Sequence, residues 1–329
     1  MTKAVVQLLT EGTLPALTGA TKWLNSPPLT AADLDGKVVL VNFWTYTCIN
    51  WLRTLPYVRA WAEKYREKGL VVIGIHTPEF EFEHDIQNVR LALESMGIVH
   101  PIAIDNDYAL WEAFDNRCWP SMYFIDAQGR IRHHQFGEGE YELSEQVIQQ
   151  LLAENGAQGV HGELVTVQPV GPEVPADWKS LASPETYLGY DRTSDFASPG
   201  GIQQGRNGIY EDPYALSLNQ WSLAGDWTIG AEAITSNFEK DRITYHFHAR
   251  DLNLVMGPMK PGVAIPFRVH VDNQPPGKSH GSDIDEQGRG IATDQRLYQL
   301  IRQRNHIKDH QFDIEFQNPG IEALAFTFG

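Results

Sequence analysis

Cysteine is the side chain in this sequence best suited to nucleophilic chemistry, and the chain has two, Cys48 and Cys118. Cys48 directly follows the apolar run 38–43 and precedes a long amphipathic stretch, so we expect it where a strand gives way to a helix. Backbone N–H groups and the helix dipole at such an N-terminus favour an anion and lower the pKa of a thiol. Position alone leaves two interpretations open, a reactive thiolate or a small buried apolar side chain.

Two prolines and a tryptophan accompany this cysteine. Pro56 lies eight residues after Cys48, inside the expected helix, where proline kinks the chain. Pro120 opens a later strand, and the Trp119–Pro120 bond is of the X-Pro type that can adopt the cis form. Trp44 precedes the cysteine by four residues. Together they place several distinctive side chains around one sulfur.

This combination resembles the thioredoxin superfamily, and within it the redoxin proteins of the TlpA/ResA kind. Longer segments resemble the soluble region of DipZ-type proteins, which are related to cytochrome c biogenesis reductases: VNFWTYTCIN, VIGIHTPEF, IAIDNDYALWEAF, GEGEY, ETYLGYDRTSDFASPGG, HGSDIDEQGRG, RLYQLIRQ and AFTFG. In those proteins a thioredoxin-like domain precedes a β domain similar to a carbohydrate-binding module. The resemblance implies a cis-proline at Pro120 facing the sulfur, a thiol or disulfide protein as partner, a possible glycan at the β domain, and a periplasmic or extracytoplasmic setting.

The sequence departs from that family at one decisive position. The family motif is Cys-x-x-Cys, in which the first sulfur attacks a disulfide and the second resolves the mixed disulfide. Here the fourth position is Trp51, so ordinary dithiol turnover is impossible. Three interpretations follow: Cys48 acts as a monothiol resolved by an external thiol, Cys118 beside Pro120 replaces the missing resolving thiol, or Thr45 and Cys48 imitate the Thr-x-x-Cys of peroxiredoxins.

A non-catalytic interpretation is also open. Trp44, Trp51 and Trp119 would surround a groove on the thioredoxin-like surface that docks a peptide, while the β domain binds a glycan or a protein. In the catalytic interpretation, Trp44 and Trp119 line the substrate groove beside Cys48.

Proton carriers are expected at the end of the second strand. Glu79 and His76 follow that strand, and strand ends line the functional crevice of doubly wound folds. Either could carry a proton for Cys48; alternatively, Glu79 caps the following helix and His76 is packed. Asn42 stands where classical thioredoxins have a buried acid, so the usual proton acceptor is absent.

The elements that position these residues fall into two domains. Strands are expected at 38–43, 70–75, 102–104, 122–125 and 131–136, and helices at 49–67, 86–96, 108–114 and 144–155. This alternation predicts an α/β thioredoxin-like fold, a central mixed sheet flanked by helices. Short runs with period-2 alternation then predict an all-β jelly-roll or sandwich domain with one helix at 294–304. The expected boundaries are a lead-in over 1–37, the thioredoxin-like domain over 38–155, a linker over 156–184 and the β domain over 185–329.

Weaker signals lie in the second half. His246 and His248 share one strand face and His270 lies on another, but a metal site needs three or four ligands in a closed geometry, so we expect no metal and no cofactor. Four aromatic residues could form a sugar-stacking platform or belong to the core: Tyr210, Tyr214, Trp221 and Trp227.

Composition excludes several classes of protein. The chain has 329 residues with 26 Lys and Arg against 42 Asp and Glu, a formal charge of −16, which argues against a nucleic-acid partner. Two cysteines cannot form a disulfide framework. No run reaches the roughly 20 apolar residues of a membrane-spanning helix, and the N-terminal stretch lacks the apolar core of a signal peptide. A cytoplasmic setting therefore stays open beside the extracytoplasmic one.

Overall fold

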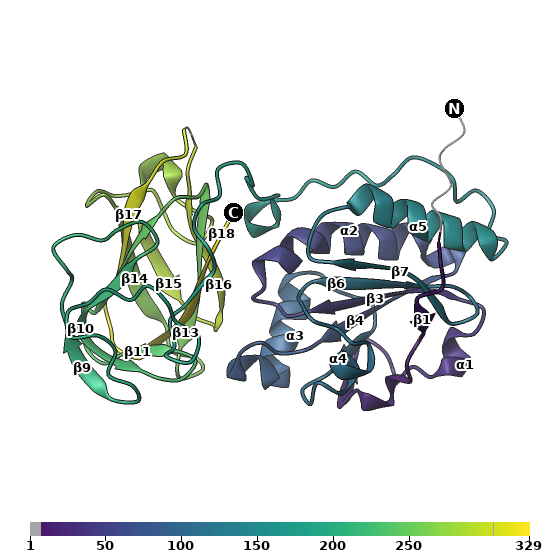
Figure 1. The fold of residues 1–329 in the computed structure, drawn as a ribbon, viewed down its shortest axis with the longest axis horizontal. Helices are drawn as coiled ribbons and strands as arrows, with labels where there is room; N and C mark the ends of the chain where they lie inside the picture. The colour runs from purple at the N-terminus through teal and green to yellow at the C-terminus, as the bar shows by residue number, and fades with distance from the viewer. Residues whose placement is uncertain (1–7, 305) are drawn as a thin grey trace. The chain divides into compact units, whose positions relative to one another are not determined.

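The chain folds into two compact units in this computed structural model, which describes residues 8–304 and 306–329. The first unit ends at Glu173 and the second begins at Val174. Figure 1 shows helices and strands mixed in the first unit and strands dominating the second. Among the described residues, no helix has both the length and the apolar character needed to cross a membrane.

The first unit is built on a mixed sheet whose strand order, over the described residues, is β1-β7-β6-β3-β4-β5-β2. Its strands are β1 (Gly12–Thr13), β2 (Lys22–Leu24), β3 (Val38–Trp44), β4 (Leu70–His76), β5 (Ile102–Ile104), β6 (Ser121–Ile125) and β7 (Arg130–Phe136). Its helices are α1 (Ala31–Leu34), α2 (Ile49–Tyr65), α3 (Ile86–Ser95), α4 (Ala109–Ala113) and α5 (Tyr141–Glu154), with 3-10 turns η1 (Leu17–Gly19), η2 (Arg66–Lys68), η3 (Glu81–His84) and η4 (Gly171–Glu173). Strands β3, β4 and β5 are parallel, while β6 and β7 run antiparallel to their neighbours.

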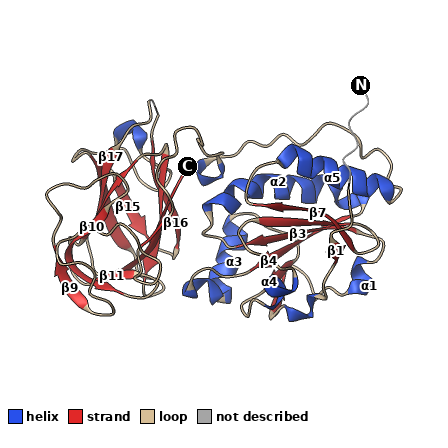
Figure 2. Ribbon diagram, viewed as in Figure 1, coloured by secondary structure: helices blue, strands red, loops and turns tan. Residues whose placement is uncertain are grey.

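Every residue of strand β3 is buried, because the strand lies in the middle of the sheet with an apolar core on each face. Successive side chains of a strand point to opposite faces, and here Leu40 joins the core under α2 and α5, whereas Val41 and Phe43 join the core under α4. Figure 2 shows α2 and α5 covering the same face of the sheet. The predicted thioredoxin-like fold, a mixed sheet flanked by helices, is confirmed.

The second unit is all-β, as predicted. Its strands are β8 (Thr186–Tyr187), β9 (Asn207–Tyr210), β10 (Trp221–Ile229), β11 (Ile234–Ser236), β12 (Arg242–Phe247), β13 (Asp251–Pro258), β14 (Ile265–Val271), β15 (Arg289–Ala292), β16 (Arg296–Arg302), β17 (His310–Phe316) and β18 (Ile321–Phe328), with one 3-10 turn, η5 (Gly277–Ser279). They pair antiparallel in one curled path, β15-β14-β17-β12-β10-β11-β18-β13-β16, with β8 on β18 and β9 on β10. The path curls around an apolar core that draws side chains from most of these strands.

One predicted element is wrong. The helix expected over 294–304 is strand β16, which pairs with β13. Its apolar residues follow a spacing that fits a helix, but a short apolar run does not distinguish a buried strand from a helix. Pairing with β13 decides the conformation.

The expected linker is partly packed on the first unit. Glu145 on α5 is 1% exposed, and one of its carboxylate oxygens accepts a hydrogen bond from the backbone N–H of Val165 at 2.8 Å. Lys64 on α2 donates to Glu145 and to the carbonyl of Glu163, and Arg59 pairs with Glu173 at 2.5 Å. The segment before Val174 is therefore fastened to α2 and α5 by polar contacts that lie far apart in sequence.

Candidate functional site

Cys48 is the N-cap residue of α2, directly after the turn that follows β3. Its N–H donates to the carbonyl of Thr45 at 3.3 Å and its carbonyl accepts from Leu52 at 3.0 Å. The Sγ atom is half-buried and lies 3.8 Å from the carbonyl oxygen of Trp119, which is joined to Pro120 by a cis peptide bond. The structure thus brings Cys48, Trp119 and Pro120 together, with the sulfur at the start of a helix.

Trp51 points into the core beneath Cys48. It is 1% exposed, its ring stacks on Trp44 with centroids 4.4 Å apart, and its Nε1–H donates to Oδ1 of Asn42 at 2.9 Å. Trp44 is equally buried, so neither ring lines a groove; this corrects the placement expected for both from the sequence. Of the three tryptophans, only Trp119 is partly exposed. The indole therefore occupies interior space and offers the surface neither a second sulfur nor an aromatic platform.

Glu83, which sequence reasoning missed, is a fully buried carboxylate beside this turn. Its Oε1 accepts from the hydroxyl of Thr47 at 2.6 Å, and its Oε2 accepts from the backbone N–H groups of Glu79 at 2.6 Å and Phe80 at 3.1 Å. Burial raises the pKa of Glu83 to about 7, although the hydrogen bonds from the Thr47 hydroxyl and the Glu79 backbone N–H lower it. The segment reads in sequence as an exposed acidic run; its alternation with aromatic residues was the available signal.

The two side chains expected as proton carriers, His76 and Glu79, differ in burial. Burial lowers the pKa of His76 to about 3, and its ring packs between Trp44 at 4.9 Å and Tyr46 at 5.8 Å, so His76 is a neutral packed side chain. Helix α3 is capped by Asp85, not by Glu79. Glu79 itself is half-buried and contributes its backbone N–H to Glu83.

Thr45 is fully buried below the turn, with only its backbone carbonyl engaging Cys48. A peroxide approaching Cys48 from solvent would not meet this hydroxyl. The arrangement therefore gives no geometric support to the peroxiredoxin-like interpretation.

Cys118 is half-buried in the loop before β6, and neither Cys118 nor Cys48 forms a disulfide. Its Sγ lies 3.7 Å from the carbonyl oxygen of Pro120, which also accepts from Gly137 after β7. Cys118 is thus on the β7 side of the loop, whereas Cys48 follows β3 on the other side of β6. Burial raises the pKa of the Cys118 thiol, which disfavours its thiolate.

Near the site, α2 also carries a buried ion pair. Arg53 donates to Glu138 at 2.9 Å, with side chains 2% and 9% exposed. The pair ties the second turn of α2 to the loop after β7. Within residues 8–304 and 306–329, no group of three or more His, Cys, Asp or Glu side chains could hold a metal ion.

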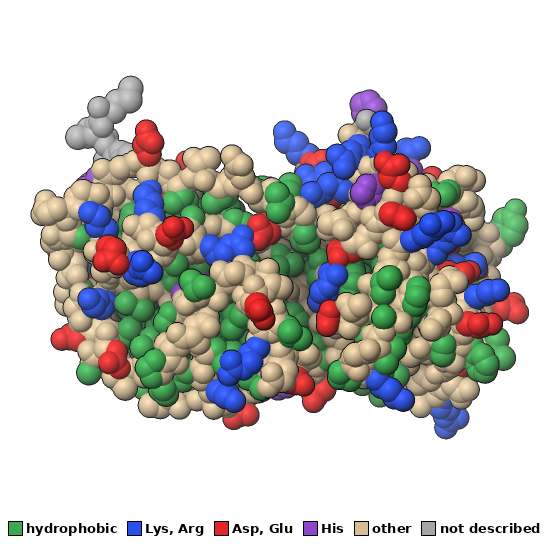
Figure 3. Space-filling model, turned by 180° about the vertical axis from the view of Figure 1, so that it is seen from behind, with side chains coloured by type: hydrophobic (Ala, Val, Ile, Leu, Met, Phe, Trp, Pro, Cys, Tyr) green, Lys and Arg blue, Asp and Glu red, His purple; other side chains and the backbone are tan. Residues whose placement is uncertain are grey.

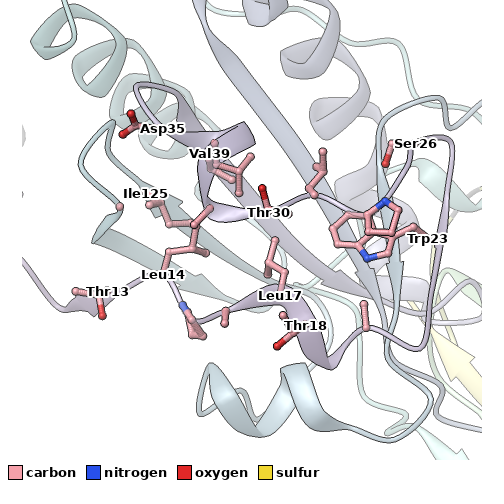
Figure 4. A pocket seen from close by; sticks show the side chains of 18 of the residues that line it. Thr13, Leu14, Leu17, Thr18, Trp23, Ser26, Thr30, Asp35, Val39 and Ile125 are labelled. Atoms are coloured by element: carbon pink, nitrogen blue, oxygen red, sulfur yellow. The ribbon is translucent and has the colours of Figure 1, made fainter.

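A separate apolar pocket of about 990 Å³ lies at the other end of β3 (Figure 4). Leu14, Leu17 and Trp23 line it from the N-terminal segment, and Val39 and Ile125 line it from the sheet. Val39 is near the start of β3 whereas Cys48 follows its end, so this pocket contains none of the candidate residues.

In the second unit, the aromatic platform expected from the sequence is mostly core. Tyr210, Trp221 and Trp227 are 3% exposed or less, and only Tyr214 is fully exposed. Tyr214 borders a groove of about 480 Å³ on the outer face of β12, β14 and β17. The groove is lined by polar side chains from these strands and from β10: Ser222, Arg242, Thr244, His270, Gln311, Asp313 and Glu315.

Surface charge is mixed. On the face seen in Figure 3, both units carry acidic and basic side chains, and several Lys and Arg side chains gather at the upper edge of the second unit. His246 and His248, expected on a solvated strand face, contact the carbonyl of Leu216 and the carboxylate of Asp309 respectively.

Comparisons with known proteins match both halves of the chain. Residues 10–152 match the family described as Redoxin, and residues 183–329 match the family described as Thioredoxin like C-terminal domain. The chain is 38% identical to protein DipZ of Mycobacterium tuberculosis (strain CDC 1551 / Oshkosh) over 256 residues, 76% of this chain and 36% of DipZ. It therefore spans about a third of the length of that relative.

Two further relatives are similar to the first half alone. Thiol-disulfide oxidoreductase YkuV of Bacillus subtilis (strain 168) is 31% identical over 141 residues, 43% of this chain and 95% of YkuV. A solved structure of a thioredoxin-like protein in the oxidized form is 30% identical, covers 46% of this chain and 97% of its own, and has a TM-score of 0.38.

Proposed function

This chain belongs to the redoxin family of thioredoxin-like, thiol-disulfide oxidoreductase-related proteins, and on that premise we propose that it exchanges disulfides through a single thiol, Cys48. The observation that supports this most is the pair of neighbouring positions in α2. Cys48 is partly exposed at the helix N-terminus, where an anion is favoured, while Trp51 is turned into the core.

The proposed exchange has two steps. The Cys48 thiolate attacks one sulfur of a partner's disulfide; the partner's S–S bond breaks, a mixed disulfide forms, and the departing sulfur leaves as a thiolate that takes a proton. A low-molecular-weight thiol then attacks the partner's sulfur in the mixed disulfide. The S–S bond between Cys48 and the partner breaks, and Cys48 leaves as a thiolate that takes a proton. The partner then carries the small thiol in a disulfide on one sulfur and a free thiol on the other.

A role for Cys118 as the resolving thiol is less well supported. Its sulfur is on the β7 side of the 118–120 loop, and burial disfavours its thiolate. The thioredoxin-like groove beside Trp119 remains the surface we propose for the partner polypeptide, because the sulfur lies 3.8 Å from the Trp119 carbonyl. The family resemblance supports an extracytoplasmic setting, which fractionation of the native host would test.

The test is formation of an adduct with glutathione disulfide. We expect a mixed disulfide on Cys48, located by peptide mass mapping and released by excess reduced glutathione. Cys118→Ser is the matched control and should form the same adduct, whereas Cys48→Ser should form none. An adduct confined to Cys118, or no adduct on either cysteine, would contradict the proposal.

A second candidate function concerns the second unit, where we propose that the groove beside Tyr214 binds a polyhydroxylated ligand such as a glycan. The supporting observation is a ring that is fully exposed next to a groove whose lining donates and accepts hydrogen bonds. Apolar sugar faces stack on aromatic rings while hydroxyl groups pair with polar side chains.

Affinity electrophoresis in gels containing β-glucan, xylan or mannan tests this candidate. Retardation by one polysaccharide that Tyr214→Ala abolishes would support it. Phe238→Ala, which changes a ring that is 63% exposed and is not among the groove residues, should leave retardation unchanged. Equal mobility of the native chain in all gels would contradict it.

A further inference from the structure

Glu83 is the most unusual side chain near Cys48. It is fully buried, and no ion pair joins it to a basic side chain anywhere in the described part of the chain. Its partners are the hydroxyl of Thr47 and the N–H groups of Glu79 and Phe80. Because a buried charge without a cation is costly, this carboxyl group has a physical reason to exchange its proton near neutral pH.

The contacts of Glu83 connect it to the reactive turn. Thr47 immediately precedes Cys48, and its hydroxyl is 2.6 Å from Oε1 of Glu83. The other carboxylate oxygen holds the segment that follows β4. One carboxyl group therefore joins the turn that carries the sulfur to the neighbouring strand end.

The electrostatic surroundings of Glu83 are acidic or neutral. The charge of Glu79 raises the pKa of Glu83, although burial is the larger cause. Burial, with the charges of Glu83 and Asp85, raises the pKa of Tyr46. The titratable groups on the elements around Glu83, which are the turn after β3, the end of β4 and η3 with its caps, are Tyr46, Cys48, His76, Glu79, Glu81, His84 and Asp85.

We propose that Glu83 is a positioning residue that regulates Cys48, holding the Thr47–Cys48 turn in place and setting by its own ionisation how much of the thiol is thiolate. This inference rests on the proposed exchange function. When Glu83 is ionised, its negative charge disfavours a second negative charge on the nearby sulfur; when it is protonated, that opposition is removed. The two groups then titrate as a coupled pair.

A purely structural role makes a different prediction. If Glu83 only caps the turn at Glu79 and Phe80, its replacement lowers stability but leaves the pH dependence of Cys48 unchanged. A coupled carboxyl group moves that pH dependence as well. The pH profile of Cys48 alkylation separates the two roles.

The experiment measures iodoacetamide alkylation of Cys48 from pH 5 to 9 in the full chain carrying Cys118→Ser. One nearby negative charge raises the pKa of a thiol by roughly one unit. We therefore expect Glu83→Gln to raise the alkylation rate by no more than about twofold at pH 6.5 to 7, where much of Glu83 is still protonated, and by up to about tenfold at higher pH, where Glu83 is ionised. The pH range over which the rate rises should also become narrower in the variant. Glu81→Gln, an exposed carboxyl in the same η3 turn, is the matched control and should leave the profile unchanged.

A second measurement uses the unmutated chain, so it remains valid even if Glu83→Gln does not fold. The carboxyl carbon of Glu83 is titrated by NMR in the unmutated chain, before and after Cys48 is blocked with the uncharged iodoacetamide adduct. Coupling is reciprocal, so we expect the Glu83 titration to move to lower pH once the thiolate can no longer form.

Identical Glu83 titrations with Cys48 free and blocked, or matching alkylation profiles in folded Glu83→Gln and its parent, would overturn the inference. If Cys48 still forms the glutathione adduct in that case, only the role of Glu83 fails. If Cys48 forms no adduct at all, the proposed exchange function fails first.

Discussion

Replacing Trp51 by cysteine restores the family's Cys-x-x-Cys motif, but we expect the substitution to destabilise the first unit strongly. The indole is 1% exposed, stacks on Trp44 and is the donor to Oδ1 of Asn42. A cysteine side chain fills only a small part of that volume and cannot reach the amide. At this position the chain therefore has a large side chain against which the surrounding core is packed.

The magnitude follows from burial. An aromatic side chain of this kind buries about 150–250 Å², which at about 25 cal/mol per Å² corresponds to roughly 4–6 kcal/mol. The buried cysteine side chain recovers part of this burial free energy. The amide oxygen of Asn42, however, is left buried without its donor, which costs about 1–3 kcal/mol. We therefore expect Trp51→Cys to lower the free energy of unfolding by about 3–5 kcal/mol. Trp51→Phe keeps a ring in place and should cost about half as much.

Urea unfolding followed by circular dichroism at 222 nm is the assay, because the α-helices among the described residues lie in the first unit. The measurement is made under reducing conditions, so that no new disulfide contributes. Trp178→Ala changes an indole that is 60% exposed and should shift the midpoint only slightly. A loss below about 1 kcal/mol for Trp51→Cys would refute the packing argument.

Three further outcomes are expected. Burial raises the pKa of Glu83 from 4.5 to about 7 in the folded chain. Between pH 4.5 and 7 the unfolded chain therefore loses this proton first, and the free energy of unfolding falls by about 3 kcal/mol as pH rises. Urea unfolding at a series of pH values should show this decline in the unmutated chain and not in Glu83→Gln. Burial raises the pKa of Cys118, so at pH 7 iodoacetamide should modify Cys48 at least about tenfold faster by peptide mass mapping; equal rates would contradict this. Arg53→Ala leaves Glu138 buried without its partner and should cost about 3 kcal/mol or more in the same unfolding assay, whereas an unchanged midpoint would show that the pair contributes nothing.

Local signals in the sequence were enough to predict much of the fold. The apolar run at β3, the cysteine that follows it and the Trp119–Pro120 step each depend on neighbouring residues alone, and the structure has the strand, the helix N-cap and a cis peptide bond at these places. The alternating runs of the second half likewise predicted an all-β unit.

What the sequence did not reveal depends on contacts between distant residues. Trp51 is held in the core by its stacking on Trp44 and its hydrogen bond to Asn42. The role we propose for Glu83 depends on its hydrogen bond with Thr47, which is 36 residues away. Strand β16 was predicted as a helix because its pairing with β13 cannot be read from a short apolar run. Each failure therefore occurred where tertiary packing outweighed a local pattern.

We propose that Cys48 alone performs the exchange, and the fate of the chain after reaction with glutathione disulfide distinguishes this from a mechanism that uses both cysteines. Intact-mass analysis should find one glutathione on Cys48 that persists until an external thiol is added, with Cys118 still reduced. Spontaneous release of the glutathione with formation of a disulfide between Cys48 and Cys118 would contradict the account, because it would show that the chain supplies its own resolving thiol.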